Sequence, residues 1–444
     1  MDSTAGQRGL PQELVDIVID HQHSDRDTLK QCSLVCRSWV PSSSLHLLRR
    51  VAWPVRPHRR QTCDYDDGIL SGEPKACSCP DPADTSFRAC ITGLQTSDRL
   101  RLYVRTLGLS SARQRCAGSV KWEKLDVSVI ASILNSLPDL KGLHLESCAL
   151  KSSPVFYMGT PSQSPSQLPA PLLGGQRRDI EELSVCELAR GSAAEPLNDL
   201  FSYFGHIGTL SVEHVPHWEL PRSTFLRPLP ELRVAHLVLN SSATAVATAL
   251  CLELRAHTHM EAVRALTVDH LTTLTLKFAC AAPNLEALTV LAVGVHAPLP
   301  PVQEVPEAPA RLRRLAFIVA LEFKETRHGF YSSTFRAVGA HIRALAGLNS
   351  HVDEVALEFR VHVHEELWLD LEFNLYDVLQ RALSPYAEWQ TIGEALDDYP
   401  SLQKLTLQVH NSEEPGRLCA IILKSAATRH LPQKYVSMLR IERD

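Results

Sequence analysis

Four cysteines in a segment rich in Pro, Asp and Ser have side chains that could ligate zinc. They are Cys63, Cys77, Cys79 and Cys90, with His58 nearby. Structural zinc sites usually pair their ligands as Cys-x2–4-Cys, because the chain must turn between two sulfurs about 2.3 Å from the metal. Here the pair is Cys-x-Cys, and 13 and 10 residues separate it from the outer cysteines. The spacing therefore favours a loop with reduced thiols over a metal site.

Two His-x-His pairs, at residues 257–259 and 362–364, also have a residue type that binds metals. The second pair lies on an alternating segment, where the histidines share the polar face with Glu358 and Arg360. A solvated strand face explains that arrangement without a metal. The first pair has no carboxylate or third histidine at motif spacing. We therefore expect neither pair to be a ligand set.

No catalytic motif is recognisable in the sequence. Gly174-Gly175 is followed by Gln176 rather than by the Lys-Ser/Thr of a phosphate-binding loop, and neither G-x-S-x-G nor H-E-x-x-H occurs. The sequence therefore predicts a protein that is not an enzyme and that needs no cofactor.

The amino-acid composition argues against several further classes of protein. Of 444 residues, 44% are apolar, which favours a folded chain over a disordered one. Lys and Arg total 45 and Asp and Glu total 50, so a net charge of −5 argues against nucleic acid or an anionic membrane as the main partner. No run approaches the roughly 18 apolar residues of a membrane span, and no cleavable leader is recognisable. We expect a soluble protein of the cytoplasm or nucleus, where its 12 cysteines stay reduced.

Residues 10–53 have the pattern of three short amphipathic helices. Asp25 is expected to cap the second helix and Pro41 to end it, after which Ser42–Ser44 would cap the third. So short a helical unit cannot bury all of its apolar side chains within itself. We therefore expect an apolar surface there that another protein covers.

Two motifs in this segment resemble the F-box family. Residues 10–14 read Leu-Pro-Gln-Glu-Leu, and residues 29–39 read Leu-Lys-Gln-Cys-Ser-Leu-Val-Cys-Arg-Ser-Trp. They match the F-box pattern almost position for position, in the variant typical of mushroom-forming fungi. The resemblance implies a substrate-receptor subunit of a Skp–cullin–F-box ubiquitin ligase, in which the F-box binds the Skp adaptor and, through it, cullin.

The resemblance also implies which residues contact the adaptor, although some of them must instead form the internal core of the helices. The implied contacts are Leu10, Pro11, Leu14, Val18, Ile19, Leu29, Leu34, Val35 and Trp39. Gln22 departs from the family, which usually has Leu or Phe there, so that edge of the contact would be weaker. The alternative is a plain helical cap over the end of a repeat domain.

The rest of the chain repeats one pattern, apolar-x-x-apolar-x-apolar, whose last part alternates as a one-sided strand should. Apart from the copy at 271–276, the copies between residues 180 and 312 begin 22 to 29 residues apart, close to the roughly 20–29-residue period of leucine-rich repeats. The copies span residues 104–109, 140–145, 180–185, 207–212, 234–239, 263–268, 271–276, 285–290, 312–317, 352–357 and 402–407.

These copies resemble leucine-rich repeats in degenerate form. The usual Asn or Cys three residues after the last strand position occurs only at Cys148. Helix-like segments precede several strands, at residues 128–137, 253–262 and 374–396. The expected fold is an α/β solenoid, in which a three-helix F-box precedes an irregular leucine-rich-repeat horseshoe. An ordinary mixed α/β domain whose strands happen to match is the alternative.

The expected organisation has five parts, and two proline-dense stretches within the repeats are expected to be mobile loops, at 151–178 and 294–310. The parts are a flexible tail over residues 1–9, the F-box over 10–53, an irregular loop over 54–95, the degenerate repeats over 96–420 and a C-terminal cap or tail over 421–444.

Polar positions between the apolar residues of each strand are the expected contacts for a protein substrate, because the strands of a solenoid line its concave face. These candidates are Lys141, His144, Glu146, Glu181, Glu182, Ser184, Glu286, Thr289, Gln403, Lys404 and Gln408. The alternative function is a leucine-rich-repeat scaffold that binds protein partners and has no role in ubiquitination.

Overall fold

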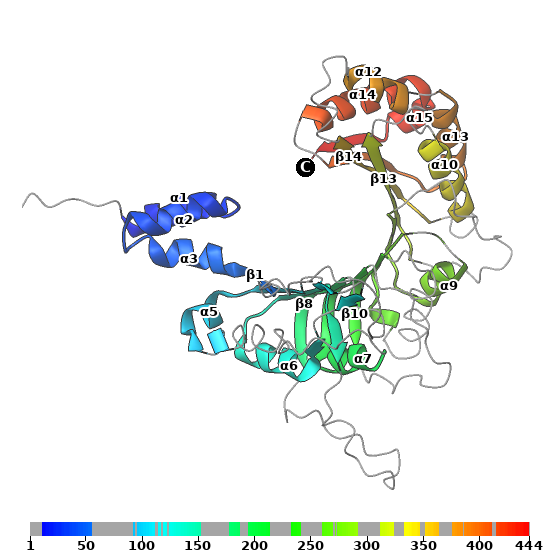
Figure 1. Cartoon of the computed structure of the whole chain (residues 1–444). Coiled ribbons are helices and arrows are strands. Elements are labelled where there is room, and N and C mark those ends of the chain that lie inside the picture. The colour runs from blue at the N-terminus through cyan, green and yellow to red at the C-terminus, as the bar shows by residue number, and fades with distance from the viewer. Residues whose placement is uncertain are drawn as a thin grey trace, which may run out of the picture. The chain divides into compact units, whose positions relative to one another are not determined.

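The structure is a computed structural model of the whole chain, which divides into two compact units, residues 1–204 and 205–444. Each unit is built from helices and mostly parallel strands, an α/β fold that three helices precede (Figure 1). The residues that it describes are 11–55, 92–93, 96–111, 114–116, 119–121, 124–151, 177–186, 194–213, 232–240, 260–269, 271, 273–291, 311–323, 333–346, 351–363, 375–384, 386–410 and 414–443.

The three expected N-terminal helices are present as α1 (Gln12–His21), α2 (Arg26–Val35) and α3 (Val40–Arg49). Asp25 caps α2, since its Oδ1 accepts hydrogen bonds from the backbone N–H groups of Asp27 and Thr28 at 3.1 and 3.0 Å. Helix α3 contacts both of the others (Figure 1).

Two predictions about the start of α3 were wrong: Pro41 does not end α2, and Ser42–Ser44 lie within α3, whose N-cap is Trp39 with no side-chain cap hydrogen bond. Helix α2 ends at Val35, and Pro41 lies in the first turn of α3, where its missing N–H costs no helical hydrogen bond. Helix α3 leads directly into strand β1 (Arg50–Val55), which crosses the expected boundary between residues 53 and 54.

In the first unit, four parallel strands are neighbours in chain order. They are β1, β2 (Thr106–Ser111), β6 (Gly142–Glu146) and β8 (Arg178–Cys186). Two two-stranded pairs and three helices complete the described part of this unit. These are antiparallel β3 (Gln114–Cys116) and β4 (Ser119–Lys121), parallel β5 (Lys124–Asp126) and β7 (Ala149–Lys151), and α5 (Asp98–Tyr103), α6 (Val127–Ser136) and α7 (Ala194–Ser202).

In the second unit, eight strands are parallel neighbours, again in chain order. They are β9 (Phe204–Glu213), β10 (Arg233–Asn240), β11 (Ala265–Val268), β12 (Ala287–Val290), β13 (Arg314–Phe323), β14 (Glu354–Val363), β15 (Lys404–His410) and β16 (Leu439–Arg443). The helical segments are the 3-10 turn Met260–Ala262, α9 (Thr273–Ala281), α10 (Ser333–Ala346), α12 (Leu375–Leu383), α13 (Tyr386–Leu396), α14 (Glu414–His430) and α15 (Gln433–Val436).

Ten of the eleven apolar copies coincide with strands β2, β6 and β8–β15. The last two apolar residues of each copy lie on the core face, as Leu143 and Leu145 do on β6. The copy at 271–276 is wrong as a strand, because residues 273–281 form α9. The structure adds the terminal strands β1 and β16, which the pattern did not predict.

One backbone arrangement recurs at the start of six strands. The carbonyl of Arg105, directly before β2, accepts hydrogen bonds from the N–H groups of Lys141 and Gly142, 2.6 and 2.9 Å away, at the start of β6. Four other carbonyls directly before a strand accept two N–H groups from the next strand's start in the same way, those of Arg264, Glu286, Arg313 and Asp353, and the carbonyl of Lys141 accepts those of Glu181 and Glu182 within β8. Successive units therefore repeat one local geometry.

Cys148 has the contacts expected of the polar position that closes a repeat. Its side chain is buried, and its Sγ lies 3.6 Å from the carbonyl oxygen of Leu109 in the preceding strand and 3.2 Å from that of Glu146. It ties the end of β6 to β2.

Several element boundaries expected from the sequence differ in the structure, and others fall outside the described residues. The helix expected over 128–137 is α6, one residue earlier, whereas the segment 374–396 contains two helices, α12 and α13. Helix α14 runs across the expected boundary at residue 421. The tail 1–9, Leu10, and most of the segments 54–95, 151–178 and 294–310 lie outside the described residues. None of the described helices is both long and apolar enough to cross a bilayer.

Candidate functional site

The three N-terminal helices share a very small internal core. Val15, Ile19 and Leu29 are buried in it, and Trp39 and Leu47 pack against it while remaining partly exposed. Ile19 and Leu29 are fully buried, so of the two roles that the sequence left open they have the internal one. They support the surface of the helices from within and cannot touch a partner directly.

Five large apolar side chains remain exposed on α1 and α2. We call Leu14, Ile17, Val18, Leu34 and Val35 the apolar helix face. Val18 is 48% exposed and Leu34 is 79% exposed. Single exposed apolar residues are ordinary, but a concentration of them on a short helical unit is typical of a binding surface.

Polar contacts between α1 and α3 fix the orientation of the part of the apolar helix face that lies on α1. The Asp16 carboxylate on α1 accepts hydrogen bonds from the Ser42 hydroxyl of α3 and from Gln12 Nε2, the latter at 2.8 Å. The Ser42 hydrogen bond, and then that of Gln12, lower the pKa of Asp16. A second link joins His46 Nε2 to Asp20 Oδ1 at 2.7 Å.

The other described residues that the F-box resemblance implies as adaptor contacts are exposed or partly exposed beside the apolar helix face. Pro11 is exposed at the start of α1, and Trp39 is partly exposed beside the core. Gln22 is partly buried after α1, where its N–H donates to the carbonyl of Ile19 at 2.9 Å. Ile17 and Leu45 are exposed apolar residues that the family motif did not include; for Ile17, helical spacing from Leu14 was the available signal.

The expected substrate contacts in the first unit are all at least partly exposed: Lys141, His144, Glu146, Glu181, Glu182 and Ser184. Lys141 forms an ion pair with the Glu181 carboxylate, and His144 Nε2 lies 3.7 Å from Glu182 Oε2. Both pairs link the β6 region to the neighbouring strand β8. Such exposed pairs contribute little to stability, so these side chains are free to exchange partners.

The expected contacts in the second unit are also partly or fully exposed: Glu286, Thr289, Gln403, Lys404 and Gln408. Glu286 Oε1 accepts a hydrogen bond from Arg264 Nη1 at 3.2 Å, which again links two successive strand starts. Lys404 differs from the others, because it belongs to a larger cluster of charges.

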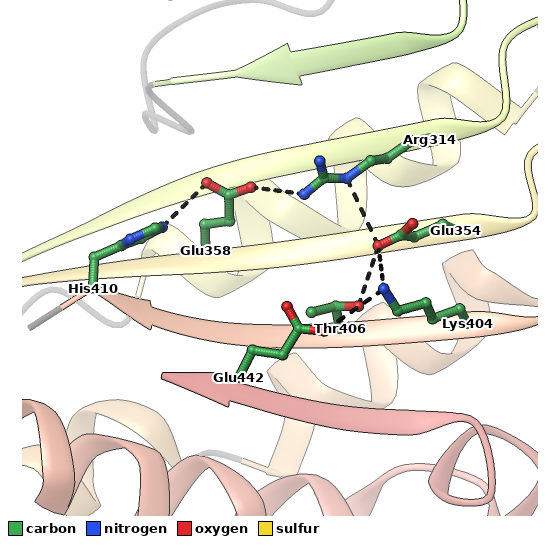
Figure 2. A network of polar contacts seen from close by, with 7 residues as sticks. All are labelled: Arg314, Glu354, Glu358, Lys404, Thr406, His410 and Glu442. Atoms are coloured by element: carbon green, nitrogen blue, oxygen red, sulfur yellow. Dashed lines mark hydrogen bonds and ion pairs between the residues drawn. The ribbon is translucent and has the colours of Figure 1, made fainter. Parts of the chain in front are cut away.

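Seven side chains on the polar face of β13–β16 form a connected cluster, which we call the sheet network (Figure 2). Glu354 Oε1 is its centre, with Lys404 Nζ at 3.0 Å, the donating Thr406 hydroxyl at 3.3 Å and Arg314 Nε at 3.7 Å. The members are Arg314, Glu354, Glu358, Lys404, Thr406, His410 and Glu442.

A second carboxylate extends the sheet network along the strands. Glu358 Oε1 accepts from Arg314 Nη2 at 3.2 Å, and its Oε2 lies 3.4 Å from His410 Nε2 (Figure 2). At the other end, Glu442 Oε1 lies 3.7 Å from Lys404 Nζ. The strand register makes this possible, because it pairs Arg314 with Glu354 and Glu354 with Lys404 on adjacent strands.

His236, on the polar face of β10, is a functional residue type that the sequence reasoning passed over. Its Nε2 lies 2.9 Å from the Thr267 hydroxyl on β11, and burial lowers the pKa of its imidazole. The side chain is therefore neutral at physiological pH and serves to link two strands.

The described residues contain no group of three or more His, Cys, Asp or Glu side chains arranged to hold a metal ion. The segment from Cys63 to Cys90 and the pair 257–259 lie outside those residues, as does His364. No family model matches the chain, and no curated protein matches its sequence. The assignment of function therefore depends on the two surfaces themselves.

Proposed function

We propose that this chain is the substrate-receptor subunit of a Skp–cullin–F-box ubiquitin ligase. In this proposal α1–α3 act as the F-box, and a Skp-type adaptor covers the apolar helix face. The parallel strands act as an irregular leucine-rich-repeat solenoid that holds the protein substrate. The apolar helix face is the observation that carries the proposal, because it lies on the segment whose two motifs resemble the F-box.

The energetics of the apolar helix face favour a covered state. Burying a Leu, Ile or Val side chain completely is worth about 1.5–3 kcal/mol. Covering five such side chains, which are 48 to 79% exposed, would contribute roughly 4–9 kcal/mol before the cost of association is subtracted. That contribution is comparable to the cost of association, so it favours a covered face, and a stable complex needs further contacts.

The recurrent backbone arrangement supports the repeat part of the proposal. Directly before each of six strands, one backbone carbonyl accepts two hydrogen bonds from the next strand of the sheet. The strands of each unit also follow one another in chain order. Repeated units of this kind present a long row of polar positions to a partner. The chain itself would perform no chemistry, and it would raise the effective concentration of a substrate near the ubiquitin-charged enzyme.

The direct test measures the affinity of the full chain for a purified Skp-type adaptor. Leu34→Glu places a charge at the most exposed residue of the apolar helix face, and we expect it to weaken binding by about 100-fold or more. Ile421→Glu on α14 is the matched control, since Ile421 is also strongly exposed. The control should bind normally. Undiminished binding by Leu34→Glu, with an unchanged thermal unfolding curve, would overturn the proposal.

Pull-down from a cell extract distinguishes a ubiquitin-ligase subunit from a scaffold. The full chain should recover both Skp and cullin, whereas deletion of residues 1–53, or replacement of Leu10 and Pro11 by alanine, should lose both. A scaffold with no ubiquitin role would recover neither in any form. Recovery by the deleted chain would show that the helices are not the adaptor site.

A further inference from the structure

Four cations share the polar face of β13–β16. Arg314 and Lys404 belong to the sheet network, and the register adds two cations outside it. Arg440 on β16 is paired with Thr406, and Arg360 on β14 is paired with His410. Because alternate residues of a strand point to the same side, these four side chains lie on one surface.

The cations on this surface are more accessible than most of the carboxylates. Glu358 is 13% exposed and Glu354 is 21% exposed, whereas Arg314 is 42% exposed. Arg360 and Arg440 are both exposed. Glu442 is an accessible carboxylate at the margin, on β16. The two less accessible carboxylates hold Arg314 and Lys404 in place, so the outer layer of this surface is mainly positive.

Several cationic donors on this surface have no acceptor. Arg314 Nη2 donates to Glu358 Oε1, whereas Arg314 Nε, 3.7 Å from Glu354 Oε1, has no hydrogen-bond partner. Within the described part of the chain, no hydrogen bond or ion pair engages the guanidinium of Arg360 or Arg440. A guanidinium presents five donors in a planar fork that matches the two oxygens of a carboxylate.

We propose that the polar face of β13–β16 binds an extended segment of a partner protein that is rich in Asp and Glu. Four strands about 4.8 Å apart span roughly 14 Å, which an extended segment crosses in four or five residues. Carboxylates of that segment would engage Arg314, Arg360 and Arg440. If the proposed function is right, this acidic segment belongs to the substrate, and in that one respect the inference rests on the proposed function. The charge complementarity does not depend on the proposed function.

A basic partner segment fits the same surface less well. Its side chains would meet Arg360 and Arg440 at close range, where like charges disfavour association. The carboxylates that could attract it, Glu354 and Glu358, are already engaged by Lys404, Arg314 and His410.

The binding test uses the full chain and three labelled probes followed by fluorescence anisotropy. They are a short peptide of alternating Glu and Ser, a matched peptide of alternating Lys and Ser, and a single-stranded oligonucleotide of similar length. At about 50 mM salt, the Glu-Ser peptide should bind at least about tenfold more tightly than either alternative, and added salt should weaken it. Equal or tighter binding of the Lys-Ser peptide or the oligonucleotide overturns the inference.

Charge variants locate the binding on this face. Arg360→Ser with Arg440→Ser should weaken the Glu-Ser peptide about tenfold or more and leave the fold intact, since no described contact is lost. Lys424→Ser with Arg429→Ser removes the same charge from two exposed positions of α14 and is the matched control. An equal loss in the control would show a response to net charge alone and would overturn the inference.

Reversal of the two charges sharpens the result. Arg360→Glu with Arg440→Glu should transfer the preference to the Lys-Ser peptide, whereas an unchanged preference would overturn the inference. All of these variants leave the apolar helix face untouched, and none of the assays contains the adaptor. A failure here is therefore distinguishable from a failure of adaptor binding.

Discussion

The apolar helix face and the sheet network are both at the surface, but the first has uncovered apolar side chains and the second has charges that are already largely paired. Leu34 and Val18 have more apolar surface than their own helices can cover. In the sheet network, Glu354 and Glu358 are already joined to cations across neighbouring strands. The first surface gains by excluding water, and the second gains only from charges that complete its unused donors. The two surfaces should therefore respond differently to salt and to substitution.

The supports beneath the two surfaces also differ. The apolar helix face stands on the small core of Val15, Ile19 and Leu29. The sheet network stands on strands whose opposite side carries large buried residues such as Phe317 and Leu357. A single substitution in the core should therefore damage the helices more than it damages the sheet.

A crossed pair of variants gives the largest expected effects. Leu34→Glu should weaken adaptor binding about 100-fold and leave the affinity for the Glu-Ser peptide within about twofold. Arg360→Glu with Arg440→Glu should do the opposite. Titration of each variant with each ligand checks this separation. Loss of both affinities in either variant would show that the two surfaces are not independent.

Within the helices, core and surface positions should separate clearly in stability. Ile19→Ala removes a fully buried side chain and should cost about 2–5 kcal/mol, because it leaves a cavity in a core of few residues. Val18→Ala, one residue away on the exposed side, should cost less than about 0.5 kcal/mol. Hydrogen exchange of the amides in α1–α3 measures both, and equal costs would contradict the assignment of these faces.

The sheet network should show a smaller contrast of the same kind. Glu358→Ala removes the carboxylate that Arg314 and His410 share and should cost about 1–3 kcal/mol. Glu442→Ala removes a more exposed carboxylate and should change the free energy of unfolding by less than about 0.5 kcal/mol. Urea unfolding monitored by circular dichroism checks both variants. A larger effect at Glu442 would reverse the proposed roles.

Acid should weaken the link that orients the apolar helix face. The hydrogen bond from Ser42, and then that from Gln12, lower the pKa of Asp16 below its ordinary value of 3.8. Because the lowered pKa belongs to the folded state, the stabilisation is present above pH 3.8 and is lost as pH falls through the folded pKa. Asp16→Asn should therefore be less stable than the parent at neutral pH, and this difference should shrink below pH 3.8 and disappear once the pH is below the lowered pKa of Asp16. A difference that persists in acid would exclude this linkage.

The smallest predicted effect concerns a buried hydroxyl. Ser43 is buried in α3, and its Oγ has no hydrogen-bond partner. Ser43→Ala should therefore be neutral or should stabilise the helices by up to about 1 kcal/mol, because it removes an unsatisfied polar group. Hydrogen exchange in α1–α3 provides the measurement, and clear destabilisation would mean that the hydroxyl has a partner.

Much of the strand order could be predicted because each strand buries one face and so alternates in sequence. The same spacing misled at residues 271–276, because a short apolar run also fits a helix that is buried on several sides, as α9 is at Leu276, Phe278 and Ala279. Strand β1 begins with Arg50 and contains Pro54, so it lacks the apolar triplet on which the prediction depended.

The binding surfaces were predictable to different degrees. The F-box-like motifs selected Leu14, Val18, Leu34 and Val35, but amphipathic spacing alone cannot say whether Ile19 faces the core or a partner. For the sheet network the sequence selected only Lys404. Its other members come from separate strands, and only the register brings Arg314 and His410 to the same carboxylate.

Hydroxyl-radical footprinting of the full chain, with and without a purified Skp-type adaptor, tests most directly whether α1 and α2 form a covered surface. The account predicts that oxidation of Leu14, Val18 and Leu34 falls severalfold in the complex, while oxidation of Ile421 on α14 is unchanged. Equal oxidation of Leu14, Val18 and Leu34 in the free chain and in a saturated mixture with the adaptor would contradict it.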